Sequence, residues 1–334
     1  MKNQTYDRKG EFENLNEPAF LRVSPVNIKG TPANRLMIIV KSNGCEYAHR
    51  KEGGCTMCGF ANHLNGRVTE AQLLNQIDFA LKTVDLTEVM EINFFTIGSI
   101  FNDHELSLSF REQALQKMAA LPQIKRITIE GRAEYVTVEK LRQCKKIVGD
   151  KILEYGIGFE TVNDYLRNSV VKKNLSKEAF INLLRMAKEA NVEMYVYLLI
   201  KPFGLTEKEA IEDAVQSAEY VFKMAREIGV YARVAFEPIF IVQNTELEKA
   251  FERGEYQLAN LWTVVEVLRR TAHLGEIFVG LSDEKLSSNR SVFSCQKCNE
   301  KLKDAIEAFN KTQERSIIDQ LDCECRDNYL KKIS

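Results

Sequence analysis

Short apolar runs recur along this chain of 334 residues, and segments with helical periodicity separate them. The first run is Leu36–Val40, whose uninterrupted apolar character is typical of a strand buried on both faces. Further runs lie at residues 91–96, 124–130, 152–159, 193–200, 231–237 and 277–281. Strands that alternate with helices indicate a parallel sheet, and the pattern fits an open doubly wound sheet and a barrel equally well.

The segments between the runs predict helices over residues 69–83, 106–121, 138–144, 177–190 and 206–228. Three of them open on a hydroxyl side chain that suits a helix N-cap, namely Thr69, Ser176 and Thr206. The first and third also carry Gln72 and Glu209 three residues later, which predicts capping boxes.

Charge and composition exclude several classes of protein. The chain has 46 Lys and Arg against 47 Asp and Glu, so its net charge of -1 does not mark a nucleic-acid binder. No apolar run is long enough to span a bilayer, and residues 1–16 lack the apolar stretch of a signal peptide. We therefore expect a cytoplasmic protein without membrane association, in which close cysteines bind metal rather than form disulfides.

Seven of the eight cysteines fall in two tight groups, and only Cys144 stands alone, as a predicted core residue of a helix. The first group is Cys45, Cys55 and Cys58, directly after the first apolar run. Three thiolates suit a 4Fe-4S cluster with one iron left open, or a zinc ion completed by His49 or His63.

The second group follows the last apolar run and consists of Cys295, Cys298, Cys323 and Cys325. Four thiolates satisfy a closed tetrahedral zinc site, and they also satisfy a second iron–sulfur cluster. We predict three regions: an N-terminal arm with little periodicity (1–34), an α/β barrel (35–285) and a Cys-rich metal-binding extension (286–334).

Several motifs at successive strand ends resemble those of the radical S-adenosylmethionine (SAM) superfamily, in its elongator-like branch. They are the three-cysteine loop with Met57 before its last cysteine, Thr96–Ser99, Ile129–Arg132 with Glu134, and Gly156–Thr161. Ala133 stands where the elongator-like motif has proline. This resemblance implies a partial (β/α)6 barrel.

The resemblance also implies cofactors and site residues. Cys45, Cys55 and Cys58 would hold a 4Fe-4S cluster, which an electron donor reduces so that SAM is cleaved to a 5′-deoxyadenosyl radical. The expected cofactor-binding residues are Thr96, Gly98, Ser99, Glu130, Glu160 and Arg167. Glu130 and Arg132 are also the expected catalytic residues.

The wider pattern is similar to the radical-SAM subunits of archaeosine synthase. It includes Lys201-Pro202, Leu261-Trp262 and Leu321–Cys325. This likeness implies cleavage of the C–N bond of a lysine–deazaguanine adduct in tRNA, made by a lysine-transferring partner subunit. A different small-molecule or modified-nucleoside substrate, and a non-catalytic zinc-binding module, stay as alternatives. Candidate RNA contacts are Arg50-Lys51, Lys172-Lys173 and Lys331-Lys332, although the near-zero net charge fits a tRNA substrate poorly.

Overall fold

The computed structural model of the protein describes residues 14–50, 53–59, 67–284, 286–287 and 290–333, except for the side chain of residue 332. They contain one sheet of eight strands in the spatial order β1 to β8. The strands are β1 (Phe20–Ile28), β2 (Thr31–Val40), β3 (Val89–Thr96), β4 (Arg126–Glu130), β5 (Ile152–Glu160), β6 (Glu193–Ile200), β7 (Ala232–Pro238) and β8 (Ile277–Val279). β1 and β2 are antiparallel, and every later pair of neighbours is parallel.

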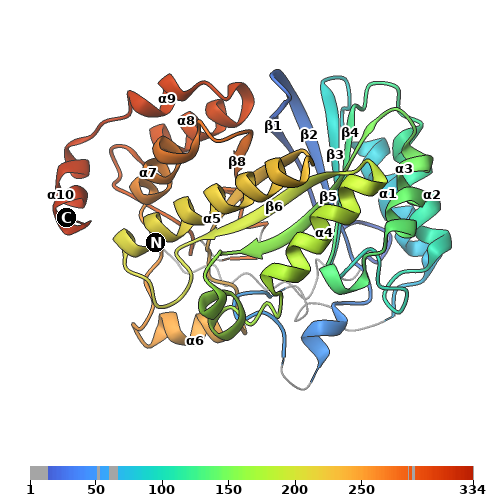
Figure 1. Ribbon diagram of the computed structural model, residues 1–334, viewed down its shortest axis with the longest axis horizontal. Coiled ribbons are helices and arrows are strands. Elements are labelled where there is room, and N and C mark those ends of the chain that lie inside the picture. The colour runs from blue at the N-terminus through green and yellow to red at the C-terminus, as the bar shows by residue number, and fades with distance from the viewer. Residues whose placement is uncertain (1–13, 51–52, 60–66, 285, 288–289, 334) are drawn as a thin grey trace.

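At least one α-helix follows each strand from β2 to β7, which confirms the predicted partial (β/α)6 barrel. The helices are α1 (Glu70–Thr83), α2 (Leu108–Ala119), α3 (Val138–Val148), α4 (Lys177–Ala190), α5 (Glu207–Ile228), α6 (Glu246–Glu252), α7 (Leu261–Thr271), α8 (Asn299–Thr312), α9 (Arg315–Asp319) and α10 (Glu324–Ile333). Figure 1 shows α1 to α3 on one flank of the strands and α7 to α9 on the other. In the described part of the chain, no helix combines the length and the apolar character needed to cross a membrane.

The predicted helix starts are confirmed by their capping hydrogen bonds. Thr69 and Thr206 each accept a hydrogen bond from a backbone N–H three residues later, and Gln72 and Glu209 complete both capping boxes. Ser176 caps α4 in the same way, without the reciprocal bond. Each cap satisfies an N–H that has no partner within its helix, so these segments begin where the sequence predicts.

Strand β1 lies within residues 1–34, so this part of the predicted arm belongs to the sheet. Residues 1–13 of that arm lie outside the described residues. β1 and β2 form a hairpin whose two turn residues, Lys29 and Gly30, have positive φ angles of 49° and 88°. Two-residue hairpin turns with two positive φ values match the twist of antiparallel strands. Gly30, as a turn residue shortly before the first apolar run, was therefore the sequence signal that could have predicted β1.

Helix α8 covers the seam between β8 and β1, the two ends of the sheet. The Asn310 side chain bonds to both backbone polar groups of Val279, and the Gln313 side chain bonds to those of Ile277. Asn27 of β1 donates a hydrogen bond to the Lys311 carbonyl at 3.0 Å. Amide side chains thus occupy the exposed edge of β8, which would otherwise offer unpaired backbone groups.

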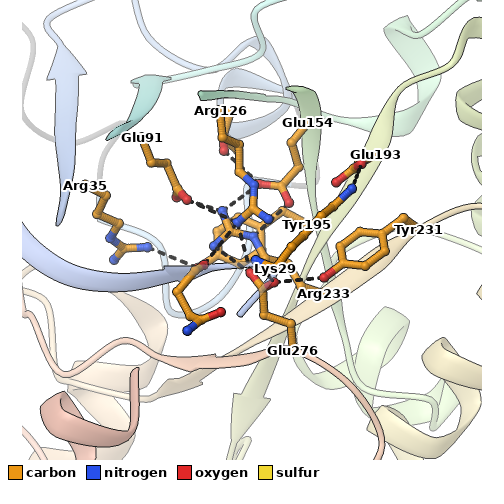
Figure 2. A network of polar contacts seen from close by, with 12 residues as sticks. Lys29, Arg35, Glu91, Arg126, Glu154, Glu193, Tyr195, Tyr231, Arg233 and Glu276 are labelled. Carbon is orange, nitrogen blue, oxygen red and sulfur yellow. Dashed lines mark hydrogen bonds and ion pairs between the residues drawn. The ribbon is translucent and has the colours of Figure 1, made fainter. Parts of the chain in front are cut away.

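The interior of the barrel near the N-terminal ends of the strands is filled by ion pairs, which we call the floor (Figure 2). Arg233 pairs with Glu91 at 2.7 Å and with Glu154 at 2.6 Å. Arg126 pairs with Glu91 at 3.2 Å and with Glu276 at 2.9 Å. Except for Glu276, these side chains are at most 1% exposed, so polar residues hidden within apparently apolar strands close this end.

Candidate functional site

The opposite end of the barrel, which we call the mouth, contains a cavity of about 320 Å³. Such a volume is within the range of small-molecule sites, and parallel α/β folds bind ligands at this end. Nine predicted site residues line the cavity: Cys45, Cys55, Cys58, Thr96, Gly98, Ser99, Glu130, Arg132 and Glu160. The structure therefore brings together residues from the loops after β2, β3, β4 and β5.

The described parts of the cysteine loop, residues 41–50 and 53–59, carry its three cysteines, a short 3-10 helix (Glu46–His49) and a turn. The Cys58 N–H donates to the Cys55 carbonyl at 3.1 Å, which closes the turn between these two ligand candidates. Burial raises the pKa of the Cys45 and Cys55 thiols. A bound metal would reverse this, because it selects the thiolate.

The histidines considered as zinc ligands do not complete the cysteine loop in the described structure. His49 is exposed and does not line the cavity, and His63 lies outside the described residues.

Glu105 joins the cysteine loop to the loop after β3. Its carboxylate accepts hydrogen bonds from the backbone N–H of Ser99 at 2.5 Å and of Glu46 at 2.7 Å. The side chain is almost fully buried, and burial raises the pKa of its carboxyl. Gly98 allows the two loops to lie this close together, since a Cβ at that position would lie 2.5 Å from the Gly44 carbonyl oxygen. Ser99 also accepts a hydrogen bond from the Arg132 N–H at 3.1 Å, so three loops are connected.

Glu130 and Arg132 lie on the wall formed by the loop after β4. Burial raises the pKa of Glu130 to about 7, against the lowering effects of Tyr197 and Lys173. The Arg132 guanidinium pairs with Glu134 at 2.6 Å and stacks over the Tyr47 ring at 3.6 Å. A carboxyl that titrates near neutral pH suits proton transfer, and a fixed guanidinium lining the same cavity suits anion binding.

Among the residues expected to hold the cluster, bind SAM or act in catalysis, Arg167 alone does not line the cavity. Its guanidinium donates to the Leu175 carbonyl at 2.6 Å and to the Thr161 carbonyl at 2.7 Å, and it pairs with Asp164. All of these partners lie within its own loop, and the side chain is fully buried.

Lys173 lines the cavity in the place where the motifs suggested Arg167. Its ammonium pairs with Glu160 at 2.8 Å. Burial lowers the pKa of Lys173, but Glu160 and Cys55 outweigh this effect and the pKa is raised. Of the candidate RNA contacts Lys172-Lys173, Lys173 therefore lies in the mouth and not on a basic surface. In the other two basic pairs, Lys51 and the side chain of Lys332 lie outside the described residues.

Two further carboxylates in the mouth were missed from the sequence. Glu237 lies near the end of β7, and Glu284 lies in the loop after β8. Burial raises the pKa of Glu237 to about 7 and that of Glu284 to about 8. Within the described chain, no side chain donates a hydrogen bond to either carboxylate. Its position could have indicated Glu237 as a site residue, because it lies at the C-terminal end of its strand, as Glu130 does.

The second cysteine group forms a compact cluster beside α7 and α8. Its four sulfur atoms lie within 4.8 Å of one another. The Cys295 sulfur is 3.4 Å from that of Cys298 and 3.8 Å from that of Cys323, and the Cys298 sulfur is 3.5 Å from that of Cys325. The Trp262 indole donates to the Cys325 sulfur at 3.2 Å. This cluster has the donor set and compactness of a metal site.

Known proteins share this architecture and much of this sequence. No protein-family model matches the chain. The uncharacterized protein MJ0550 of Methanocaldococcus jannaschii is 31% identical over 301 residues, which cover 87% of this chain and 80% of that protein. Archaeosine synthase subunit beta of Methanosarcina acetivorans is 27% identical over 318 residues, or 95% of this chain and 90% of that subunit.

Among solved structures, the archaeal Elp3 of Methanocaldococcus infernus aligns with a TM-score of 0.51 at 16% identity. The alignment covers 72% of this chain and 59% of the Elp3 chain, and it shows a shared barrel fold. Together with the motifs at the strand ends, these similarities confirm the predicted resemblance. The chain belongs to the family of the MJ0550 protein, and it shares the barrel fold of Elp3.

Proposed function

We propose that the mouth holds a 4Fe-4S cluster on Cys45, Cys55 and Cys58, with SAM beside it. The observation that carries this proposal is the convergence of the three cysteines on one cavity that Ser99, Glu130 and other motif residues also line. Three thiolates that line a cavity which the described His49 does not line fit a cluster with one open iron better than a closed zinc site.

The chain's own residues would orient SAM. The backbone of Thr96–Gly98 and the Ser99 hydroxyl suit its amino group, while Arg132 offers positive charge to its carboxylate. Arg167 is not part of this proposal, because its guanidinium is occupied within its own loop. When bound, the reduced cluster and SAM supply a 5′-deoxyadenosyl radical that abstracts hydrogen from the substrate. Glu130, with a pKa of about 7, can hold or release a proton near that substrate.

We propose a lysine–deazaguanine adduct in tRNA as the substrate, with cleavage of its lysine C–N bond. The curated relative named archaeosine synthase subunit beta covers nearly the whole chain and implies a partner subunit, which would attach the lysine. Glu237 and Glu284 support this substrate, because two partly buried carboxylates that accept no hydrogen bond from any described side chain suit an ammonium group.

Anaerobic reconstitution with iron and sulfide tests the cluster and its chemistry. We expect a 4Fe-4S absorption band and, after dithionite and SAM are added, release of 5′-deoxyadenosine. Cys55→Ala should abolish both, whereas Cys144→Ala, a buried cysteine of α3, should retain both. Absence of the band from the wild-type protein would refute the proposal.

The substrate is tested separately with the same loaded enzyme. Release of deoxyadenosine should rise with tRNA that carries the lysine adduct, and lysine or free nucleosides should not stimulate it. Stimulation by a small molecule alone would instead support the alternative substrate class.

We propose zinc at the second cysteine group. A zinc–sulfur bond of about 2.3 Å in a tetrahedral site places its sulfurs about 3.8 Å apart. The observed separations of 3.4 to 3.8 Å agree with one ion, whereas a 4Fe-4S cube holds its cysteines on four separate irons and farther apart. Metal analysis of Cys55→Ala should find about one zinc and no iron. Iron in that variant would favour a second cluster.

A further inference from the structure

The cysteine loop is fastened to a segment that no cofactor motif includes. Residues 170–173 follow a single π-helical turn after β5, and their carbonyl groups point toward the mouth loops. The Thr56 hydroxyl donates to the Val170 carbonyl at 3.0 Å, and the Thr56 N–H donates to that of Val171 at 3.1 Å. The Tyr47 hydroxyl donates to the Lys172 carbonyl at 2.5 Å.

The fourth carbonyl in this series, that of Lys173, accepts a hydrogen bond from Arg132 at 2.9 Å. Four consecutive carbonyls thus accept hydrogen bonds from two cysteine-loop residues and from Arg132. Lys172 and Asn174, which flank Lys173, both have left-handed backbone angles, with φ of 57° and 53°. Such angles are unfavourable outside glycine and persist where surrounding contacts hold them.

This backbone directs two neighbouring lysines in opposite directions. The Lys172 side chain is 38% exposed and pairs with Glu246 at 2.7 Å. The Lys173 side chain is only 16% exposed and lines the same cavity as Cys55. Gly158 makes room for it, because a Cβ there would collide with the Lys173 ammonium.

We propose that Lys173 is a positioning residue that holds a fixed positive charge beside Cys55 and thereby raises the reduction potential of the cluster. This inference rests on the proposed function. Reduction adds one electron, and a nearby cation in a poorly solvated site favours the more negative state. Glu160 is paired with Lys173 and opposes this effect, so the two side chains should shift the potential in opposite directions.

The test is an EPR-monitored redox titration of the reconstituted enzyme without SAM, with iron content measured for every variant. Lys173→Met should retain the cluster with a more negative midpoint potential than the wild type, and Lys173→Arg should restore it. Lys172→Met is the matched control, since it removes the adjacent ammonium that points away, and its potential should equal that of the wild type.

Glu160→Gln provides an independent variant if Lys173→Met loses its cluster. It leaves the Lys173 charge uncompensated, so the potential should become more positive. An unchanged potential in loaded Lys173→Met, or an unchanged or more negative one in Glu160→Gln, would overturn the inference alone. A wild-type protein that takes up no iron on Cys45, Cys55 and Cys58 would instead overturn the proposed function, and this inference with it.

Discussion

The pKa values of buried carboxylates shift in opposite directions at the two ends of the barrel. At the floor, burial raises the pKa of Glu154, but Arg233 and Arg126 outweigh it and the pKa is lowered. At the mouth, Arg35 only partly offsets burial, which raises the pKa of Glu237 to about 7 and of Glu284 to about 8. The floor carboxylates form close ion pairs with arginines, and among the described residues Glu237 and Glu284 do not, which fits a floor built for a fixed structure and a mouth built for a ligand.

The largest effect should come from removing a cation at the floor. Arg233→Met removes the buried arginine that pairs with Glu154 and leaves Glu91 paired with Arg126 alone, so we expect the free energy of unfolding to fall by about 3–5 kcal/mol. Chemical denaturation measures this change. Arg253→Met is the control, because Arg253 forms an exposed pair with Glu255 and its loss should leave the free energy of unfolding nearly unchanged. Equal losses of unfolding free energy in both variants would show that the floor ion pairs contribute no more than an exposed pair.

Much of the fold could be predicted from the sequence. The apolar runs located β2 to β8, because strands buried on both faces leave a continuous apolar signal. The missed strand β1 contains Ser24, Pro25 and Asn27, which interrupt that signal. The floor was also missed. Arg126 and Arg233 lie within apolar runs, and only the closed sheet shows that both arginines pair with Glu91.

A smaller effect, of opposite sign, should follow from removing a carboxylate at the mouth. The pKa of Glu237 is about 7 in the folded protein against 4.5 as its ordinary value, so the folded state binds the proton more tightly. Its contribution to stability is therefore complete below pH 4.5 and is lost as pH rises through 7.

Glu237→Gln should remove this loss. The wild-type free energy of unfolding should fall more steeply with pH than that of the variant, by about 2–3 kcal/mol between pH 4.5 and pH 8. Urea denaturation across this range checks the difference. A variant less stable than the wild type at pH 8 would show that Glu237 has a stabilising partner, as the floor carboxylates do.

The candidate site was only partly predictable. Motif position identified nine residues that line the cavity, because each follows a parallel strand and such ends converge. The sequence did not show that Lys173 rather than Arg167 lines the cavity, since this depends on a π-helical turn and left-handed residues that leave no clear signal in the sequence. Glu105 was missed because its role depends on the distance between two loops.

The smallest effect tests whether partners or location determine these energies. Glu105 lies at the mouth but accepts two backbone hydrogen bonds and one from Asn102 at 2.9 Å. Glu105→Gln places an amide N–H₂ against backbone N–H donors, so we expect a loss of about 1–2 kcal/mol in urea denaturation at pH 8. The same exchange at Glu237, at the same end of the barrel, should stabilise the protein at that pH. If both variants gain stability, location alone separates the mouth from the floor. If the stabilities of the two variants change in opposite directions, the hydrogen bonds and ion pairs around each carboxylate determine its contribution to stability. The floor and the mouth then differ only in how many such partners their carboxylates have.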